Sequence, residues 1–558
     1  MHASSAERRQ WRLAALASAI GLALVTTTAQ SAVTQSAERK NMQRLGHTDL
    51  QGRPTYQPNV IQYPNGKWYL FVGQHSGNPR GLIGGCPNNT LPNPLNGGAC
   101  ENNGTMIIDV TDPTAPVEIS LIPSPTGGQS QMTRMCRASQ LPNAPKTTPE
   151  QVYLLRNVQG GPSAGYEVWN VTDPAHPVMT SELRHIRSTH KDWWECDTGI
   201  MYAPGSKDAT LTSALWRESQ AMLIYDWSNP NAPPNYIRTF GLPGGQPNAD
   251  PNSPIPNSLH GAISTEEHPL KGQPLARGAG PNDVIGNRIY AAWGVGDDGV
   301  MTIIDRKKLL PPPWGTWAPK KTDSADNPDE DELYGPTSPV VGYYTMSPDE
   351  GGHTSMPVFG LKPPSFQKFN EFATRDIVLL ASEATADGVN GRCNEPPHAA
   401  YIVDVTVENS MNAPPGTRKE HDIYQGPMGM STMWLDPTFG ERYPRGNYCA
   451  RGARFGTHST EENFRNPLYG KLTAVAYFNG GLRIFDIREP YTPRQVAFYV
   501  PEANANTDPD GYMTNNVEID NRGNLYIVDR NGAGMDILQL TGCATQIVTS
   551  NGSCPAIQ

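Results

Sequence analysis

The sequence lacks the features that mark several large functional classes. Its 54 acidic and 44 basic residues give a formal net charge of −10, and no basic stripe runs along the chain. This composition argues against nucleic-acid binding. No Gly-x-Ser-x-Gly, Walker loop or His-Glu-x-x-His occurs, which removes three common catalytic frameworks. No Cys-x-x-Cys occurs either, so a thiolate metal site is disfavoured.

Long apolar segments are also scarce, and the most prominent one lies near the N-terminus. Three arginines at positions 8, 9 and 12 precede the apolar run 13–25, and small residues follow at 29–32. The run is too short for a good membrane span, so we predict a signal peptide over 1–32 and an N-terminal arm over 33–50. The paired arginines resemble a twin-arginine signal, and Sec or Tat export both stay open. We expect a periplasmic or secreted protein without stable membrane insertion.

The eight cysteines are an even number in a chain that reads as exported, so disulfides are expected. Cys86 and Cys100 bracket one loop, and Cys543 and Cys554 bracket a C-terminal tail over 542–558. We predict that each of these pairs forms a local bridge. The pairing of the other four is left open: Cys136, Cys196, Cys393 and Cys449.

An apolar motif that mostly ends in Asp or Asn recurs seven times. Glycine and proline together approach a fifth of the chain, which favours many short strands joined by turns. The copies are Met106–Pro113, Glu167–Pro174, Leu223–Pro230, Met301–Asp305, Tyr401–Val405, Leu482–Ile487 and Met535–Leu538. Further apolar strands precede each copy. Four strands in each of seven units predict an all-β fold, a seven-bladed β-propeller over 51–541 with long loops on one face.

The repeat resembles that of the LVIVD-repeat propeller family over roughly residues 50–540. The resemblance implies the propeller architecture and says little about function, because the family is defined largely by its repeat.

Histidine recurs at one position of the repeat in four successive units. His190, His260, His353 and His458 each stand at the start of the expected innermost strand. Equivalent positions in different blades surround the propeller axis, so we expect these imidazoles to converge on one transition-metal ion. Imidazole suits several metals, and Fe(II) or Cu is our first choice, with Zn as an alternative. The plainer alternative is a polar channel of histidines and water.

Two further sets of residues follow from this placement. Acidic residues after three of the histidines are candidates for orienting the imidazoles: Glu195, Glu266 and Glu461. Other side chains are expected near the mouth that carries the long loops, where a small-molecule pocket would lie: His75, Arg156, Arg217, Trp193, Glu383 and Arg530.

Three functions remain in competition. The first is a metal-dependent oxidoreductase that acts on a small organic substrate. An aromatic or apolar substrate is one of the possibilities for this function. Its four-histidine propeller site is similar in architecture to carotenoid and stilbene cleavage oxygenases and to selenium-binding methanethiol oxidases, whose sequence motifs do not surround these histidines. The second is a Zn-type metal-dependent hydrolase or lyase. The third is a non-catalytic binding or scaffold propeller. The oligomeric state is open.

Overall fold

The computed structural model describes residues 37–77, 85–87, 90–207, 215–277, 280–294, 298–319, 328, 332–333, 337–366, 374–385, 393–394, 398–408 and 426–557. The predicted signal peptide over 1–32 lies outside these residues. No helix within the described ranges is long and apolar enough to cross a membrane.

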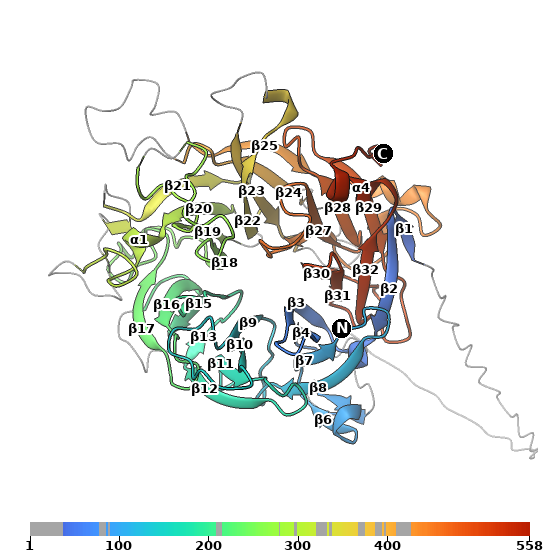
Figure 1. The fold of residues 1–558 in the computed structure, drawn as a ribbon, viewed down its shortest axis with the longest axis horizontal. Helices are drawn as coiled ribbons and strands as arrows, with labels where there is room; N and C mark the ends of the chain where they lie inside the picture. Colours follow the sequence, from blue (N-terminus) through green and yellow to red (C-terminus); the bar gives the residue numbers. More distant parts are fainter. Residues whose placement is uncertain are drawn as a thin grey trace, which may run out of the picture. The chain divides into compact units, whose positions relative to one another are not determined.

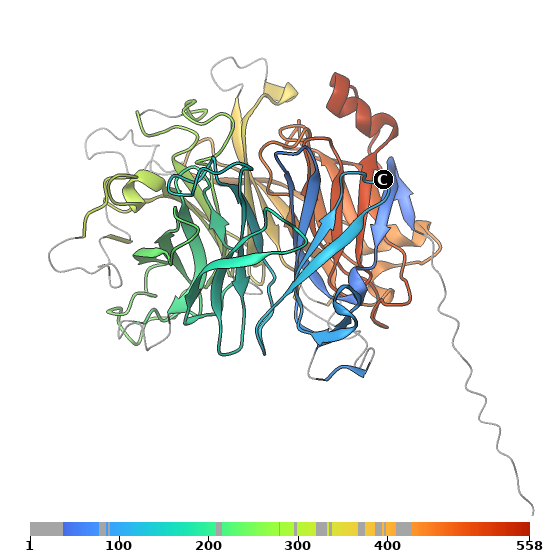
Figure 2. The ribbon, with the colours of Figure 1, turned by 60° about the horizontal axis from the view of Figure 1, so that its bottom comes forward.

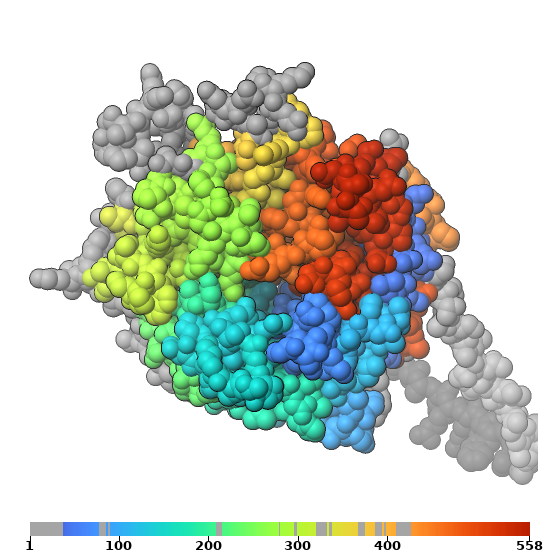
Figure 3. All heavy atoms as spheres, in the orientation of Figure 1, coloured from blue at the N-terminus to red at the C-terminus, as the bar shows by residue number. Residues whose placement is uncertain are grey.

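The described chain from residue 37 onward is an all-β propeller, in which antiparallel sheets stand side by side around a central axis (Figure 1). Strands β3, β9, β14, β18, β22, β26 and β30 lie innermost and contact one another around that axis. One face carries helix α4 and the opposite face carries the β5–β6 hairpin (Figure 2), and we name the former the α4 face. Figure 3 views the α4 face and shows a hollow at its centre.

Five sheets follow one another along the chain, and four of them begin with their innermost strand, whereas in the third the short strand β13 precedes the innermost strand β14. The first contains β3 (Thr55–Gln62), β4 (Trp68–Gln74), β7 (Gly104–Asp109) and β8 (Val117–Pro123). The chain between β4 and β7 forms a separate two-stranded hairpin of β5 (Leu91–Asn93) and β6 (Ala99–Glu101). The second contains β9 (Thr133–Arg137), β10 (Val152–Val158), β11 (Gly165–Asn170) and β12 (Val178–Arg184). The third contains β13 (Ile186–Arg187), β14 (Trp193–Trp194), β15 (Ile200–Lys207), β16 (Ala221–Asp226) and β17 (Asn235–Phe240). The fourth contains β18 (Leu259–Ser264), β19 (Arg288–Trp293), β20 (Val300–Asp305) and β21 (Val340–Thr345), with helix α1 (Arg306–Leu309) after β20. The fifth contains β22 (Gly352–Leu361), β23 (Arg375–Ser382), β24 (Ala400–Asp404) and β25 (Met428–Met433).

The remaining strands form one nine-stranded sheet made of two groups. One group contains β26 (Phe455–Thr460), β27 (Leu472–Phe478), β28 (Leu482–Asp486), β29 (Arg494–Val500) and β1 (Glu38–Lys40). The other contains β30 (Thr514–Ile519), β31 (Leu525–Asp529), β32 (Met535–Leu540) and β2 (Met42–Thr48), followed by helix α4 (Gly542–Ser550). The groups meet at a single pair, Phe478 with Thr514.

The N-terminal segment belongs to this sheet. β1 pairs with β29 and β2 pairs with β32, so the described part of the predicted arm over 33–50 supplies two strands instead of lying outside the propeller. The physical reason is that β32 would otherwise present an open edge of unpaired amides and carbonyls. The propeller therefore begins before residue 51, which is the boundary predicted from the sequence.

The apolar runs of the sequence are the middle strands of the sheets. Every residue of β10 and of β27 is buried, because neighbouring sheets cover both of their faces. The outermost strands are more exposed, as in β8, whose Val117 is 54% exposed.

The Asp or Asn that ends most copies of the motif has a defined role. The side chains of Asp109, Asn170, Asp226, Asp404 and Asp486 each accept a hydrogen bond from the amide two residues later, at 2.9–3.1 Å. This arrangement stabilises the turn into the outermost strand. The repeat therefore encodes both a strand and its turn.

Four disulfides are present, and the two local bridges are those predicted. Cys86 pairs with Cys100, and Cys543 with Cys554. The pairs that the sequence left open are Cys136–Cys196, which joins β9 to the segment after β14, and Cys393–Cys449. Four bridges indicate an oxidising environment.

Candidate metal centre

Five aromatic side chains form a ring around the propeller axis. The four histidines singled out from the sequence lie together, with successive ring centroids 4.3, 4.0 and 4.1 Å apart from His190 through His260 and His353 to His458. Tyr56, in β3, closes the ring, with its centroid 5.5 Å from that of His190 and 5.2 Å from that of His458. The residues converge because adjacent innermost strands run parallel, as the bridge between residues 191 and 261 shows.

Two of these histidines and one glutamate could hold a metal ion. His260, His353 and Glu383 offer ligand atoms that all lie within 4.8 Å of one another, and all three side chains are buried. Glu383 follows directly after β23. Its carboxylate is 3.9 Å from Nε2 of His353 and 3.7 Å from Nε2 of His458. The described donor set is therefore histidine and carboxylate, where the sequence predicted four histidines alone.

Several buried ring nitrogens in this cluster lack a partner. Nδ1 of His190, Nε2 of His260 and Nε2 of His458 make no hydrogen bond to any described residue. Nδ1 of His458 lies 2.7 Å from the backbone oxygen of Asn515, which can only accept, so that nitrogen carries the proton and Nε2 carries the lone pair. Buried polar atoms without a partner require an explanation, and a bound ion would supply one.

The imidazoles are held in the neutral form that metal ligation requires. Burial, followed by the charges of Lys191 and Arg530, lowers the pKa of His190 to about 3. Burial also lowers the pKa values of His260, His353 and His458 well below their usual range. Neighbouring imidazoles act in the same direction on His260 and His353, and nearby cations do so on all three.

Positive side chains surround the carboxylate of Glu383. Its Oε1 lies 3.2 Å from Nη1 of Arg454 and 3.6 Å from Nη1 of Arg530. Nη2 of Arg530 is in turn 3.0 Å from Nε2 of His75. Burial raises the pKa of Glu383, although both guanidinium groups oppose the shift. The sequence-predicted pocket residues His75, Glu383 and Arg530 thus lie together at the ring.

A charged network lies on the other side of the ring. Nδ1 of His353 is 2.8 Å from the hydroxyl of Thr354, which also accepts a hydrogen bond of 2.7 Å from Nζ of Lys191. Lys191 pairs with Glu462, and Arg134 pairs with the same carboxylate at 2.7 Å. These buried contacts orient His353 and fill the channel toward the α4 face.

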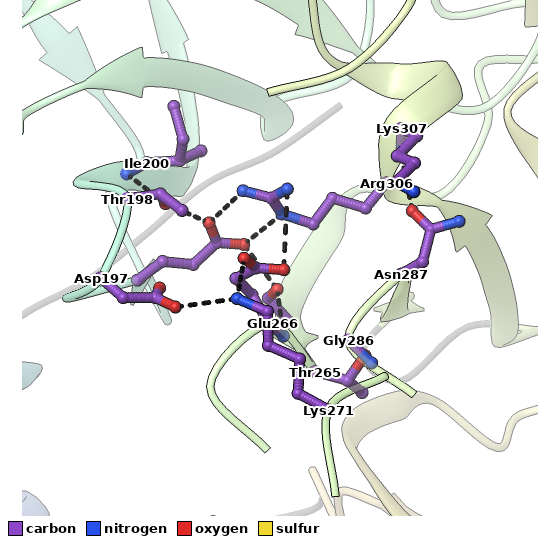
Figure 4. Close-up of polar contacts among 12 residues, drawn as sticks. Asp197, Thr198, Ile200, Thr265, Glu266, Lys271, Gly286, Asn287, Arg306 and Lys307 are labelled. Atoms are coloured by element: carbon purple, nitrogen blue, oxygen red, sulfur yellow. Dashed lines mark hydrogen bonds and ion pairs between the residues drawn. The ribbon is translucent and has the colours of Figure 1, made fainter. Parts of the chain in front are cut away.

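The three acids predicted to orient the histidines do not contact them. Glu195 accepts hydrogen bonds of 2.8 and 2.6 Å from Arg306. Glu266 lies 3.7 Å from the same guanidinium and pairs with Lys271, and Figure 4 labels Glu266, Lys271 and Arg306. Glu461 accepts hydrogen bonds from the hydroxyl of residue 473 and the amide of residue 474. The prediction was wrong because a strand rises about 3.3 Å per residue, which carries Glu195 toward the far end of the channel.

Three predicted pocket residues also have other roles. Arg156 is fully buried and is bound by Glu167 and by the carbonyls of residues 122 and 123. Arg217 donates to the carbonyls of residues 244, 250, 251 and 253, so it anchors a loop. Trp193 lines a cavity near the α4 face, at the opposite end of the channel from the ring.

Next to Arg217, Glu218 is buried without a hydrogen-bond partner for either carboxylate oxygen among the described residues. Burial raises the pKa of Glu218 to about 8. Above pH 4.5 the carboxyl group of Glu218 loses its proton in the unfolded state, whereas in the folded state it keeps the proton up to about pH 8. This group therefore lowers the free energy of unfolding as the pH rises from 4.5 to 8. We expect Glu218→Gln to have little effect at pH 4.5 and to increase the free energy of unfolding at pH 8. Denaturant titrations across this range would measure it, and parallel pH profiles for both proteins would contradict it.

The sequence interpretation missed two residues of the site. Tyr56 stands at the ring position of the first sheet, and aligning Thr55-Tyr56 with Thr189-His190 and Thr457-His458 could have found it. Glu383 was placed in the pocket but not among the metal ligands, because it follows a middle strand and has no counterpart in the histidine pattern.

The chain was compared with protein families, curated proteins and solved structures. No protein-family model matches the sequence, and no curated protein matches it. Among solved structures, the β-propeller domain of Cps50 (Swd1) from Myceliophthora thermophila is 11% identical, with a TM-score of 0.40 over 89% of this chain and 98% of that one. The Dos1 propeller is 9% identical, with a TM-score of 0.40 over 90% of this chain and 96% of that one. Sqt1 from Chaetomium thermophilum is 10% identical, with a TM-score of 0.41 over 91% of this chain and 100% of that one.

Proposed function

We propose that this chain is an exported metal-dependent oxidoreductase with one metal ion at the axis of a seven-bladed propeller. Counting the two groups of the nine-stranded sheet as separate blades supports the number seven. Membership of the LVIVD-repeat family stays a prediction from the repeat. The observation that carries the function is the buried cluster of His260, His353 and Glu383.

The donor set favours iron. Two histidines and one carboxylate are the ligands of many non-haem Fe(II) oxygenases. His458 is close enough to Glu383 to act as a fourth ligand, at 3.7 Å between the nitrogen and the carboxylate oxygen. Four protein ligands complete the tetrahedral coordination that zinc prefers. His260, His353 and Glu383, with His458 nearby, would hold the ion, and a ferrous ion there would supply the redox chemistry that an oxidoreductase needs.

A ferrous ion at this site would supply the one-electron redox chemistry. The protein would supply position and charge. The hydroxyl of Tyr56 lies 3.2 Å from Nε2 of His353, so it can donate a hydrogen bond to a group held beside that histidine. Arg454 and Arg530 add positive charge at Glu383, which favours a small organic substrate that carries a carboxylate. Four of the five ring residues are buried, which limits the access of bulk water: Tyr56, His260, His353 and His458.

The test is elemental analysis of untagged protein, followed by anaerobic reconstitution with Fe(II), Cu or Zn and oxygen-uptake assays with a panel of small carboxylic acids. One equivalent of iron with iron-dependent oxygen uptake is expected. One equivalent of zinc without oxygen uptake would favour the hydrolase. No retained metal after reconstitution would overturn the proposal and leave a non-catalytic binding propeller.

A further inference from the structure

A buried lysine crosses the central channel beside the histidine ring. Lys191 lies between His190 and β14, and its side chain is only 2% exposed. The backbone of Lys191 forms a parallel bridge with Gly261 of the next sheet, and the lysine stem passes directly over that glycine. A Cβ atom at Gly261 would lie 2.9 Å from Cδ of Lys191. The glycine therefore leaves the space through which Lys191 reaches the far wall of the channel.

Two acceptors on that wall hold the ammonium group. Nζ of Lys191 donates a hydrogen bond of 2.7 Å to the hydroxyl of Thr354, in β22, and forms an ion pair with Oε1 of Glu462, just after β26. Arg134, in β9, binds the other oxygen of the same carboxylate at 2.7 Å. This network joins four of the innermost segments that surround the axis in Figure 1. Its geometry is therefore fixed by the propeller itself.

The network has more positive than negative charge. Burial opposes ionisation of Glu462, but Lys191 and Arg134 outweigh it and lower the pKa of this carboxyl group. Burial also lowers the pKa of Lys191, and the carboxylate of Glu462 acts against that shift. Two cations thus share one carboxylate, and one positive charge is left without compensation inside the network.

This charge acts on the whole ring. Lys191 is connected to Nδ1 of His353 through the hydroxyl of Thr354, by contacts of 2.7 and 2.8 Å. After burial, which is the larger cause, the Lys191 ammonium also lowers the pKa of every ring histidine: His190, His260, His353 and His458. Because the network is buried, solvent and salt screen its charge only weakly. It therefore disfavours additional positive charge within the ring.

We propose that Lys191 is a positioning residue that raises the reduction potential of the metal ion at the ring. The inference rests on the proposed function, because it requires a redox-active ion held by His260, His353 and Glu383. Loss of one electron converts a ferrous ion into a ferric ion, which carries one more positive charge. The nearby ammonium raises the free energy of the ferric form more than that of the ferrous form. Lys191 thus favours the reduced ion, and Thr354 holds it in register with His353.

The experiment is a potentiometric titration of the full-length protein loaded with iron, followed by its visible and electron paramagnetic resonance spectra. Lys191→Met removes a positive charge and should lower the equilibrium constant for reduction by about 10-fold, which is about 59 mV for one electron. Glu462→Gln removes the negative charge of the same network and should raise that constant by about 10-fold. Shifts of opposite sign identify an electrostatic role, because simple damage to the packing has no reason to follow the sign of the charge removed.

Two further variants complete the test. The double variant Lys191→Met/Glu462→Gln keeps the net charge of the network, so its potential should lie close to that of the parent protein. It removes both members of the buried pair, so it decides the question even if one of the single variants fails to fold. Lys271→Met, at a lysine that is 47% exposed, is the matched control and should leave the potential unchanged.

The possible outcomes separate this inference from the proposed function. Shifts of the same sign in the two single variants, no shift in either, or a large shift in the double variant would overturn the role of Lys191 and leave the metal site in place. A parent protein that retains no iron would overturn both. Circular dichroism of each variant verifies folding before the titration.

Discussion

Glu383→Gln is expected to lower the affinity of the protein for a divalent metal ion by more than 100-fold. The substitution keeps the shape of the side chain and removes the carboxylate that joins His260 and His353 in the candidate site. Removing outer partners of metal ligands typically costs about 10- to 100-fold in affinity, so removing a ligand should cost more. Elemental analysis after dialysis against a weak chelator would measure the retained metal, and His353→Ala should give the same result.

The matched control is Glu182→Gln, since Glu182 is 44% exposed and pairs with Arg184 in an outer strand. It should retain the metal content of the parent protein. His176→Ala is the corresponding histidine control, because His176 is 82% exposed and pairs only with Asp173 among its described neighbours. Full metal retention by Glu383→Gln with an intact fold would contradict the ligand assignment.

Arg306→Met is expected to destabilise the fold by about 3–5 kcal/mol, the usual cost of removing one partner from a buried ion pair. Glu195 is fully buried and paired with Arg306, at 5% exposure of the arginine side chain. Burial opposes the charged form of Glu195, but the Arg306 guanidinium outweighs it and lowers the pKa of Glu195. Without Arg306, the buried carboxylate would have to remain charged and uncompensated or take up a proton. Guanidinium chloride unfolding at pH 7 would measure the change.

Two comparisons make this test specific. The double variant Arg306→Met/Glu195→Gln should recover part of the lost stability, because it no longer buries an unpaired charge. Lys271→Met removes a lysine that is 47% exposed and should cost less than about 1 kcal/mol. A loss below 1 kcal/mol for Arg306→Met would show that this cluster contributes little to stability.

The repeat carried most of the information that the sequence held about the fold. The motif that ends in Asp or Asn predicts a strand and a turn, and the structure shows both in copies such as Asp109 and Asp486. The histidines were found because propeller repeats bring equivalent positions to one axis. The two local disulfides followed from short separations along the chain.

Residues whose role depends on non-repeated contacts could not be predicted in this way. Arg306 lies in a helix after β20 that replaces the usual turn. Its guanidinium donates a hydrogen bond to Glu195, which lies 111 residues earlier in the chain. Nothing near Glu195 in the sequence indicates this partner. The pairing of Cys136 with Cys196 likewise depends on which sheets are adjacent in space.

The pairing of β1 with β29 and of β2 with β32 constrains the order in which the chain can fold. Residues 38–48 are synthesised early, yet their partners lie more than 450 positions later: Met42 pairs with Leu540. Such distant contacts slow folding, because a large loop must close before they form. The closing strands therefore remain without partners until nearly the whole chain has been made. Joining the two ends with a short linker and opening the chain at an exposed turn elsewhere would remove this delay.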